Sequence, residues 1–395
     1  MSILRSVQGA PRDPILGLTE AYQSDTRDQK VNLGVGVYTD SEGKVPLLDC
    51  VQAADKQLAE GRTPWSYLPI DGLKAYDNAV AELVFGTSVP RERLAVVQAL
   101  GGTGGLKVAA DFLHQLDPDA PVLISDPSWE NHRALFTRAG FTVGSYPYYD
   151  AAKRAVNFAG MLEGLKAAAP GTIVVLHACC HNPTGYDITR EQWQQVLQVV
   201  QEGRLVPLLD MAYQGFASGI DDDGYAVRLF AEAGVTTFVT TSFSKTFSLY
   251  GERIGALSVI CGDDDEAKRV LSQLKIVVRT NYSNPPTHGA KVVATVLADE
   301  TLRQQWEDEL GAMRDRIKAM RTGLREGLEK ARPDVDWSYI TTQNGMFSYS
   351  GLSKEAMGKL REEYGIYGLD SGRICVAALN EKNLPYVIEA IAAVA

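Results

Sequence analysis

A cluster of hydroxyl and cationic side chains near the middle of the chain offers the clearest chemistry. The stretch Thr240-Thr-Ser-Phe-Ser-Lys-Thr-Phe-Ser-Leu-Tyr-Gly-Glu-Arg contains Ser242, Ser244, Lys245 and Arg253. A Lys in such surroundings is either a counter-charge for a phosphate or an amine held for covalent reaction with a carbonyl group. An isolated Lys is usually a solvated surface residue, but the neighbouring hydroxyls and Arg253 favour a functional role for Lys245.

A glycine-rich stretch, Gly101-Gly-Thr-Gly-Gly-Leu-Lys107, follows an apolar run and opens a helical pattern. Glycines let backbone N–H groups approach an anion, and the start of a helix attracts negative charge. The alternative is a plain glycine-rich turn. The spacing of a Walker A loop is absent, and no G-x-G-x-x-G motif supports dinucleotide binding.

Asp210 ends an apolar run that we predict to be a strand, and its carboxylate could hold a metal, cap a helix or pair with a buried cation. Four possible metal ligands precede it: His177, Cys179, Cys180 and His181. Adjacent residues of a strand point to opposite faces, which argues against convergence of the two Cys side chains. We therefore predict no metal site, and we interpret Asn182-Pro-Thr-Gly185 as a fixed turn.

The elements that must position these residues alternate between about residues 87 and 260. Five compact, β-branched runs are predicted strands, beginning at Val122, Ile173, Leu205, Thr237 and Ile254. Thr189 begins a helix with a Thr–Gln capping box, and Gly203 follows that helix as its stop. This alternation predicts an α/β fold with a mostly parallel sheet covered by helices on both faces. Ligands of such sheets bind beyond the carboxyl ends of the strands, where the polar stretches lie.

The texture of the chain changes after the predicted sheet. A charged stretch with one apolar stripe predicts a long helix over about residues 300–331, which Pro333 ends. A smaller α+β part follows, with a strand at 345–350 and a helix at 355–364. The first 45 residues or so show no strand–helix alternation, and we expect them to pack with this part. The predicted domains are 1–46 (N-terminal arm and part of the small domain), 47–310 (large domain) and 311–395 (small domain).

Composition excludes several classes of protein. The chain has 395 residues, 39 basic and 49 acidic, with a net charge of −10; this argues against nucleic-acid or anionic-membrane binding. Five scattered Cys residues without a Cys-x-x-Cys pair predict neither a disulfide framework nor a zinc site. No apolar run approaches the roughly 20 residues that span a bilayer, and the start of the chain lacks a secretory apolar segment. We expect a cytoplasmic protein.

Four motifs taken together resemble a known family. They are Asn182-Pro-Thr-Gly185, Asp210-x-x-Tyr213, Ser242-Phe-Ser-Lys245 with Arg253, and Ser371-Gly-Arg373. Their order and spacing resemble the fold-type I pyridoxal-phosphate aminotransferases, in the subfamily that acts on aspartate and aromatic amino acids. The resemblance extends from Pro14 to the residues after Arg373. It implies a large domain with a seven-stranded, mostly parallel sheet and a smaller α+β domain built from both termini.

The resemblance implies pyridoxal 5′-phosphate as the cofactor, with Lys245, Asp210 and Tyr213 as catalytic residues. Lys245 would bond covalently to the cofactor and then shuttle a proton, and Asp210 would bind the ring nitrogen. Tyr213 and Asn182 would contact the ring oxygen, and Trp129 would stack on the ring. The phosphate would be held by backbone, hydroxyl and guanidinium donors of Gly102, Thr103, Ser242, Ser244 and Arg253.

The same resemblance implies a substrate site that two subunits share. Arg373 would bind the α-carboxylate of the substrate with support from Asn182, and Gly36 and Trp129 would line the site. A partner subunit would supply the hydroxyl of Tyr67 and a second cation, Arg279, for the distal carboxylate of aspartate, glutamate or 2-oxoglutarate. The expected partners are therefore amino acids, 2-oxo acids and a second copy of the chain.

The positions at the entrance of the implied substrate site are mixed in type: Val37, Thr39, Val45, Ser66, Thr103 and Asn284. Asn284 and Val37 resemble the aspartate-specific branch, whereas Val45 suits a pocket that accepts a ring. We predict transamination of tyrosine, phenylalanine and tryptophan with 2-oxoglutarate, with aspartate and glutamate also accepted. The alternatives are an aspartate-preferring aminotransferase, a carbon–sulfur lyase with the same cofactor, and a non-enzymatic phosphate-binding module.

Overall fold

A seven-stranded sheet forms the centre of the larger part of the molecule. The computed structural model describes residues 2–10, 15–61, 64 and 66–395. The strands lie in the order β2 (Leu94–Leu100), β10 (Ile254–Ile260), β9 (Thr237–Ser242), β8 (Val206–Met211), β7 (Ile173–His177), β3 (Val122–Asp126) and β4 (Val143–Pro147). Only β10 runs against its neighbours, so the predicted mostly parallel α/β sheet is confirmed.

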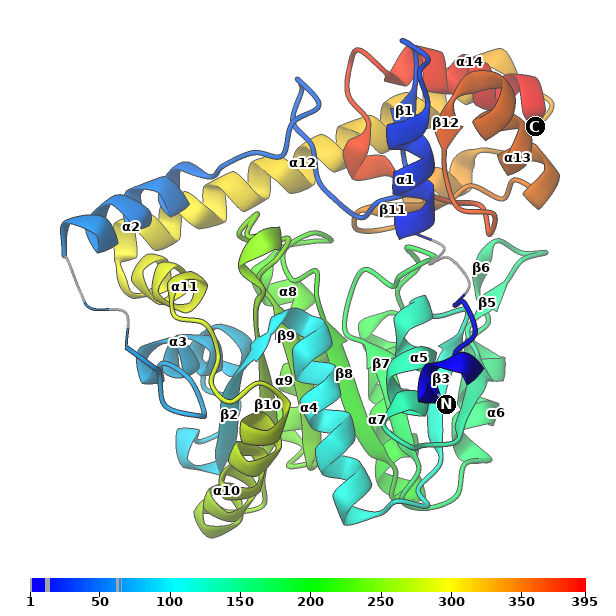
Figure 1. The fold of residues 1–395 in the computed structure, drawn as a ribbon. Coiled ribbons are helices and arrows are strands. Elements are labelled where there is room, and N and C mark those ends of the chain that lie inside the picture. The colour runs from blue at the N-terminus through cyan, green and yellow to red at the C-terminus, as the bar shows by residue number, and fades with distance from the viewer. Residues whose placement is uncertain (1, 11–14, 62–63, 65) are drawn as a thin grey trace.

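Helices cover both faces of this sheet because residues along each strand alternate between two cores. One core packs the sheet against α4 (Gly101–Leu116), α5 (Glu130–Arg138) and α10 (Asp264–Asn281). The other packs it against α3 (Lys74–Phe85), α6 (Phe158–Lys166), α7 (Arg190–Gly203) and α9 (Tyr225–Glu232). Figure 1 shows α4 crossing one face of the strands.

Most predicted elements are confirmed, with small differences at their ends. Thr189 caps α7 through the predicted capping box with Gln192. Gly203 belongs to that helix, however, and the left-handed residue that ends it is Arg204 with φ +50°. The strand predicted at residues 345–350 is shorter, β11 (Phe347–Tyr349), because Gly345 has a φ of +77° that breaks an extended chain.

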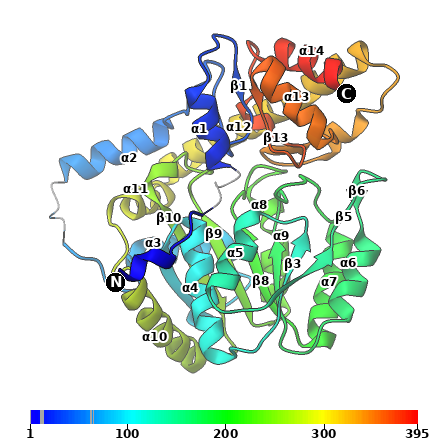
Figure 2. The same cartoon turned by 45° about the vertical axis from the view of Figure 1, so that its right-hand side comes forward.

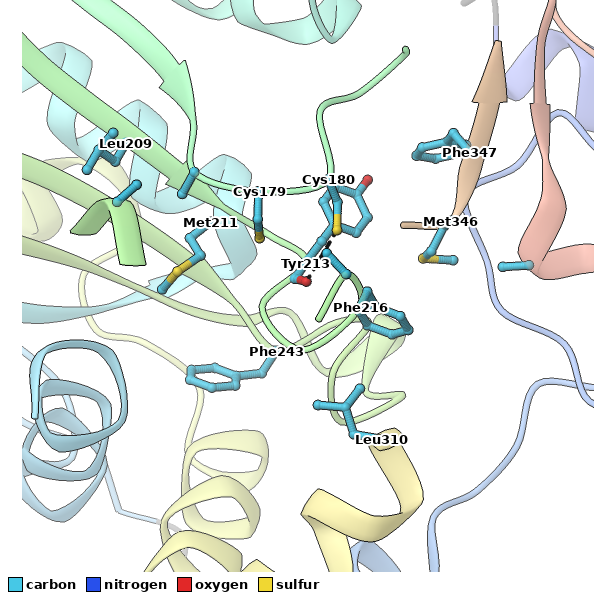
Figure 3. Close-up of a cluster of buried hydrophobic side chains, with 14 of the residues drawn as sticks. Cys179, Cys180, Leu209, Met211, Tyr213, Phe216, Phe243, Leu310, Met346 and Phe347 are labelled. Atoms are coloured by element: carbon cyan, nitrogen blue, oxygen red, sulfur yellow. Dashed lines mark hydrogen bonds between the residues drawn. The ribbon is translucent and has the colours of Figure 1, made fainter. Parts of the chain in front are cut away.

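The predicted long helix is α12 (Glu300–Ala331), one continuous element of about 48 Å at 1.5 Å per residue. It crosses above the large sheet, from α2 (Asp49–Glu60) and α11 (His288–Ala298) at one end to α14 (Leu384–Val394) at the other (Figure 1). Its buried stripe contains the predicted apolar residues and one cation, Arg321. Leu310 of this stripe points toward Phe216 beside the sheet (Figure 3).

Residues 16–32 pack with the C-terminal part of the chain, as predicted, but the N-terminal end itself lies away from the C-terminal end (Figure 2). β1 (Val31–Asn32) pairs in parallel with β12 (Ile366–Tyr367), and β11 pairs with β13 (Arg373–Cys375). These pairs group with α12, α14, α1 (Leu16–Ser24) and α13 (Lys354–Tyr364) beyond the sheet (Figure 2). The division of the chain at residues 46 and 310 stays a prediction.

The remaining elements are short. They are η1 (Ile3–Ser6), η2 (Arg91–Arg93), η3 (Tyr250–Glu252), η4 (Ser338–Thr342), η5 (Val376–Ala378), α8 (Ile220–Asp223) and the hairpin of β5 (Tyr149–Asp150) and β6 (Ala155–Val156). In the described part of the chain, no helix is long and apolar enough to cross a membrane.

Candidate active site

A cavity of about 230 Å³ opens where the carboxyl ends of β7, β8 and β9 meet the segments from the two chain ends. It gathers twelve of the predicted site residues: Gly36, Gly102, Thr103, Trp129, Asn182, Asp210, Tyr213, Ser242, Ser244, Lys245, Arg253 and Arg373. Two predicted residues, Tyr67 and Arg279, do not line it. The polar stretches found in the sequence therefore converge because strand ends of a parallel sheet share one edge.

One group of residues in the cavity wall is suited to bind an anion. The start of α4 lies there with its free backbone N–H groups, beside the hydroxyls of Ser242 and Ser244. Arg253 donates through Nη1 to Ser244 Oγ at 3.3 Å and through Nη2 to Leu100 O at 3.4 Å. A Cβ on Gly101 would lie 2.4 Å from Arg253 Nη2, so only glycine lets the guanidinium lie over the start of the helix. These donors suit a phosphate group.

The cavity wall also contains a buried carboxylate, Asp210, near the end of β8. Its Oδ2 lies 2.9 Å from His132 Nε2, and its Oδ1 accepts a hydrogen bond from Thr240 at 3.3 Å. Burial raises the pKa of Asp210, but the hydrogen bond from His132 and the positive charges around it outweigh burial and lower the pKa below its usual value. The site therefore holds a negative charge ready for a cationic partner.

A chain of hydrogen bonds continues from Asp210 into the protein. An ionised carboxylate only accepts, so His132 Nε2 donates, and its Nδ1 lies 2.9 Å from Ser128 Oγ. Ser128 Oγ lies 3.3 Å from His177 Nε2, and His177 Nδ1 accepts the backbone N–H of Asn182 at 3.4 Å. Burial lowers the pKa of His177 well below its usual value, which matches this neutral donor–acceptor role. The chain links Asp210 to the Asn182 turn.

Lys245 also lines the cavity. Burial lowers the pKa of its amine to about 8, although the charge of Asp210 opposes this change. Its Nζ lies 4.8 Å from the centre of the Tyr213 ring. A Lys with such a pKa has a large neutral fraction near pH 8, and the neutral amine is the form that attacks a carbonyl or accepts a proton.

Arg373 faces the cavity from β13 with only 1% of its surface exposed. It donates through Nη1 to Asn182 Oδ1 at 3.2 Å and through Nη2 to Gly34 O at 2.6 Å, and its guanidinium lies 4.3 Å from the centre of the Phe347 ring. Its Nε has no hydrogen-bond partner, and no carboxylate of the described residues forms an ion pair with it. A buried cation in this condition is chemically suited to bind a carboxylate.

Comparison of the whole chain with known proteins decides its family. A family model described as aminotransferase class I and II matches residues 28–391. The chain belongs to this family. The resemblance stated from the four sequence motifs is confirmed, together with the fold it implied.

Relatives of this aminotransferase match along its full length. It is 57% identical to the aspartate aminotransferase of Pseudomonas aeruginosa, with 99% of each chain covered. It is 48% identical to the aromatic-amino-acid aminotransferase of Escherichia coli, with 99% of this chain and 100% of the relative covered. A crystal structure of the aromatic-amino-acid aminotransferase of Burkholderia pseudomallei, covalently bound to pyridoxal phosphate, matches with 61% identity, a TM-score of 0.98 and 100% coverage of both chains.

The cavity of the aminotransferase fits pyridoxal phosphate, and the cofactor prediction is confirmed. The anion-binding groups at the start of α4, the carboxylate of Asp210 and the amine of Lys245 all line the cavity. The cofactor presents a phosphate, a ring nitrogen and an aldehyde, and each has a matching group here.

Tyr67 and Arg279 lie apart from the cavity of the same chain. Tyr67 is 91% exposed, and Arg279 lies exposed near the end of α10, where its Nη1 donates to Ser283 Oγ. The two segments that carry them adjoin, because Asn284 Nδ2 donates to Leu68 O at 2.8 Å. The side chains predicted to serve a partner subunit are thus presented together on one surface.

The two adjacent Cys residues do not lie in a strand, so the prediction that their side chains point to opposite strand faces was wrong. Cys179 and Cys180 follow β7 instead of lying in it, and Cys180 has a φ of +52°, so their side chains are not on opposite strand faces. Their sulfur atoms and an oxygen of Asp223 lie within 4.8 Å of one another. Asp223 already accepts backbone N–H groups of Gly215, Ala217 and Ser218. The prediction of no metal stays a prediction.

Sequence reasoning missed several residues of the cavity. Leu106, Tyr250 and Phe347 line its wall, and the buried His132, with the half-buried Ser128 and His177, supports Asp210. His132 lies in none of the four motifs that resembled the family, and it is far from Asp210 in the sequence. Phe347 had no signal, because an apolar residue in a short strand is typical of any core.

Proposed function

We propose that this aminotransferase transfers the amino group of aromatic amino acids to 2-oxoglutarate, and that it also accepts aspartate and glutamate. The observation that carries the proposal is one cavity lined by the amine of Lys245, the carboxylate of Asp210 and the cation of Arg373, which has no ion-pair partner among the described residues. The names of the relatives support both substrate classes, since aspartate and aromatic-amino-acid aminotransferases match at comparable identity.

Most residues of the cavity would hold the cofactor in place. Asp210 would bind the protonated ring nitrogen, and Tyr213 and Asn182 would contact the ring oxygen. Trp129 would stack against the ring. The phosphate would be held by the anion-binding residues of the cavity wall, which are Gly102, Thr103, Ser242, Ser244 and Arg253. When bound, pyridoxal phosphate supplies an aldehyde that takes up amino groups and a cationic ring that withdraws electrons from the substrate Cα.

Lys245 would do the acid–base work. Its neutral Nζ would accept the proton that leaves the substrate Cα, and the ammonium formed in this way would later give a proton back as the amino group is transferred. The lowered pKa of the amine fits both roles near pH 8. Asp210 keeps its negative charge throughout, because the hydrogen bond from His132 stabilises the ionised form.

Arg373 would bind the α-carboxylate that all these substrates share. Its Nε and the edges of its planar fork match two carboxylate oxygens, and Asn182 and Gly34 already hold the other donors in place. The Phe347 ring against its face fixes the plane of the guanidinium. A common anchor of this kind explains how one cavity would accept substrates with different side chains.

The side chain of the substrate would contact a part of the site whose charge depends on the position of Arg279. Arg279 of a second subunit would bind the distal carboxylate of aspartate, glutamate or 2-oxoglutarate. A ring placed against this cation would leave it desolvated and unpaired, which costs several kcal/mol. The Arg279 side chain is exposed, and its guanidinium donates to Ser283 near the end of α10. We therefore propose that this guanidinium moves into solvent when an aromatic substrate is bound.

A homodimer with shared active sites follows from the same proposal. Tyr67 and Arg279 are exposed, lie on adjoining segments and are absent from the cavity of their own chain. Leu47 and Ile276 add exposed apolar surface, with 61% and 53% of their area in solvent. We also propose that the protein is located in the cytoplasm.

The test is a panel of half-reactions on the purified protein loaded with pyridoxal phosphate. We expect phenylalanine, tyrosine and aspartate to bleach the cofactor absorbance, with a larger second-order rate for the aromatic substrates, and 2-oxoglutarate to restore it. Lys245→Ala is the control and should give no turnover. Release of ammonia and pyruvate from cystine without amino transfer would instead support a lyase.

Arg279→Ala separates the two substrate classes. The variant should lose at least about a hundredfold in the rate with aspartate, because an unpaired distal carboxylate is costly, while the rate with phenylalanine stays within about threefold. A larger rate for aspartate than for phenylalanine in the wild type would favour the aspartate-preferring alternative. An equal loss for both substrates in Arg279→Ala would contradict a role in distinguishing them.

A further inference from the structure

Arg321 is a buried cation outside the cavity, on the stripe of α12 that faces the rest of the molecule. Only 3% of its surface is exposed, and burial lowers the pKa of its guanidinium to about 10. Among the residues that the structure describes, no Asp or Glu forms an ion pair with it. Burying a charge without a counter-charge costs free energy, so its hydrogen bonds must compensate.

All the hydrogen-bond partners of Arg321 are neutral oxygens of one short segment, residues 340–347. Its Nη1 donates to Ile340 O at 3.3 Å and to Gln343 Oε1 at 3.4 Å. Its Nη2 donates to Gly345 O at 2.8 Å, to Asn344 O at 3.3 Å and to Phe347 O. Without the guanidinium, the carbonyl oxygens of Ile340, Asn344, Gly345 and Phe347 would lose this buried donor, whereas Gln343 Oε1 would keep Ser348 Oγ and the Tyr349 N–H as donors. Because a buried carbonyl without its donor costs free energy, we expect the segment to shift.

The end of this segment determines where Arg373 lies. Phe347 begins β11, which pairs with the strand of Arg373, and its ring lies 4.3 Å from the guanidinium of Arg373. The ring has little freedom, because a Cβ on Gly36 would lie only 2.7 Å from its Cζ. A shift of the Phe347 main chain would therefore move the aromatic ring against which the guanidinium of Arg373 packs.

The middle of the segment determines where Asn182 lies. The backbone N–H of Asn344 donates to Gly185 O at 2.6 Å, and its Nδ2 donates to Asp187 Oδ2 at 3.1 Å. Asp187 in turn accepts the backbone N–H groups of Cys180 and His181. These contacts hold both sides of the turn that carries Asn182, whose Oδ1 accepts a hydrogen bond from Arg373.

We propose that Arg321 is a positioning residue for substrate binding. By holding residues 340–347 it sets the relative placement of Arg373 and Asn182, the pair that would receive the α-carboxylate. It touches neither substrate nor cofactor. The inference rests on the proposed role of Arg373, and it adds that the affinity for carboxylate substrates depends on a cation of α12 that is not in the cavity.

The experiment compares Arg321→Met and Arg321→Lys with the wild type, each loaded with pyridoxal phosphate. The dissociation constant of phenylalanine comes from saturation of the half-reaction, and that of maleate, an unreactive dicarboxylate, from spectral titration. We expect Arg321→Met to weaken both at least about tenfold, while the dissociation constant of the cofactor changes less than about twofold. Arg321→Lys should recover part of the affinity, because an ammonium supplies three donors.

Arg325→Met is the matched control, because Arg325 is on the same helix one turn further and contacts Thr341 of η4 and Glu329, but not residues 343–347. It should leave both dissociation constants unchanged. A folded Arg321→Met variant with wild-type affinity for maleate would overturn the proposal. So would an equal loss in the Arg325 control, which would indicate a general loss of stability.

A double variant keeps the test decisive if Arg321→Met does not fold. If Arg321 acts through Arg373, the effect of Arg321→Lys on maleate binding should vanish in an Arg373→Lys background, whereas any effect on thermal stability should persist. Additive losses of affinity would overturn the proposal. Failure of the wild-type holoenzyme itself to bind any carboxylate would reject the proposed function, and this inference with it.

Discussion

His132 Nε2 lies 2.9 Å from Asp210 Oδ2, and both groups are buried at the carboxyl end of the central sheet. The two residues are 78 positions apart in the chain, on α5 and at the end of β8. The imidazole is the donor that keeps the carboxylate ionised in a place where burial alone would favour its neutral form. The negative charge under the proposed ring nitrogen is therefore a property of the pair.

Replacing His132 by Phe tests this pair. The ring volume is nearly kept, but the donor to Asp210 is lost, so the pKa of Asp210 should rise and its hold on a protonated ring nitrogen should weaken. We expect kcat/KM to fall by about tenfold or more, since hydrogen bonds to charged groups contribute about 1.5–3 kcal/mol. His132→Gln, which keeps an N–H donor, is the matched control. Wild-type kcat/KM in His132→Phe would contradict the role.

The amine of Lys245 should control how fast the protein takes up its cofactor. Burial lowers the pKa of this amine from the usual 10.5 to about 8, so its reactive neutral form grows as the pH rises through 8. The rate of covalent attachment of pyridoxal phosphate to cofactor-free protein should therefore rise with pH and level off above that value. Stopped-flow absorbance measures it, with Lys245→Ala as the blank. A rate still rising steeply at pH 10 would contradict the lowered pKa.

Arg373 should govern the binding of all amino-acid substrates alike. Arg373→Ala leaves the α-carboxylate without its partner in a buried site, and we expect kcat/KM to fall at least about a hundredfold for both phenylalanine and aspartate. Arg373→Lys keeps the charge but loses the planar fork, so it should restore only part of the rate. The loss should appear mainly in KM. A selective loss for one substrate class would show that Arg373 binds the side chain instead.

His288 should make the stability of the protein depend on pH. It contacts Glu252 through Nδ1 at 2.9 Å and Asp55 through Nε2 at 3.0 Å. Partial burial lowers its pKa, but the two carboxylates outweigh burial and raise it above 6.5. A raised pKa in the folded state stabilises the fold fully below pH 6.5, and this stabilisation is lost as the pH rises through the folded-state value.

The thermal midpoints of the wild type and His288→Gln measure this effect. The wild type should exceed the variant more at pH 6 than at pH 9, because only the protonated ring pairs with both carboxylates. Asp55→Asn should reduce the difference at pH 6. The same gap between wild type and His288→Gln at both pH values would show that the charge of His288 has no part in stability.

Much of the secondary structure was predictable from local patterns. The five strand predictions, the Thr189 capping box and the full extent of α12 are confirmed, because periodicity and capping involve residues a few positions apart. The polar residues after the strands were predicted to meet for the same reason, since strand order places their ends at one edge. The predictions were wrong near Arg204 and Cys180, because both residues have a positive φ that regular helices and strands do not contain.

Residue types and short-range spacing were enough to predict the sheet, its helices and the kinds of chemistry at the strand ends. Only the tertiary structure placed His132 on Asp210, Arg373 on Asn182, and Arg321 on the segment before Phe347. Arg373 and Asn182 are 191 positions apart, and no local pattern carries such a distance. Contacts of this kind arise from packing, where the burial of a charge forces distant oxygens to gather around it.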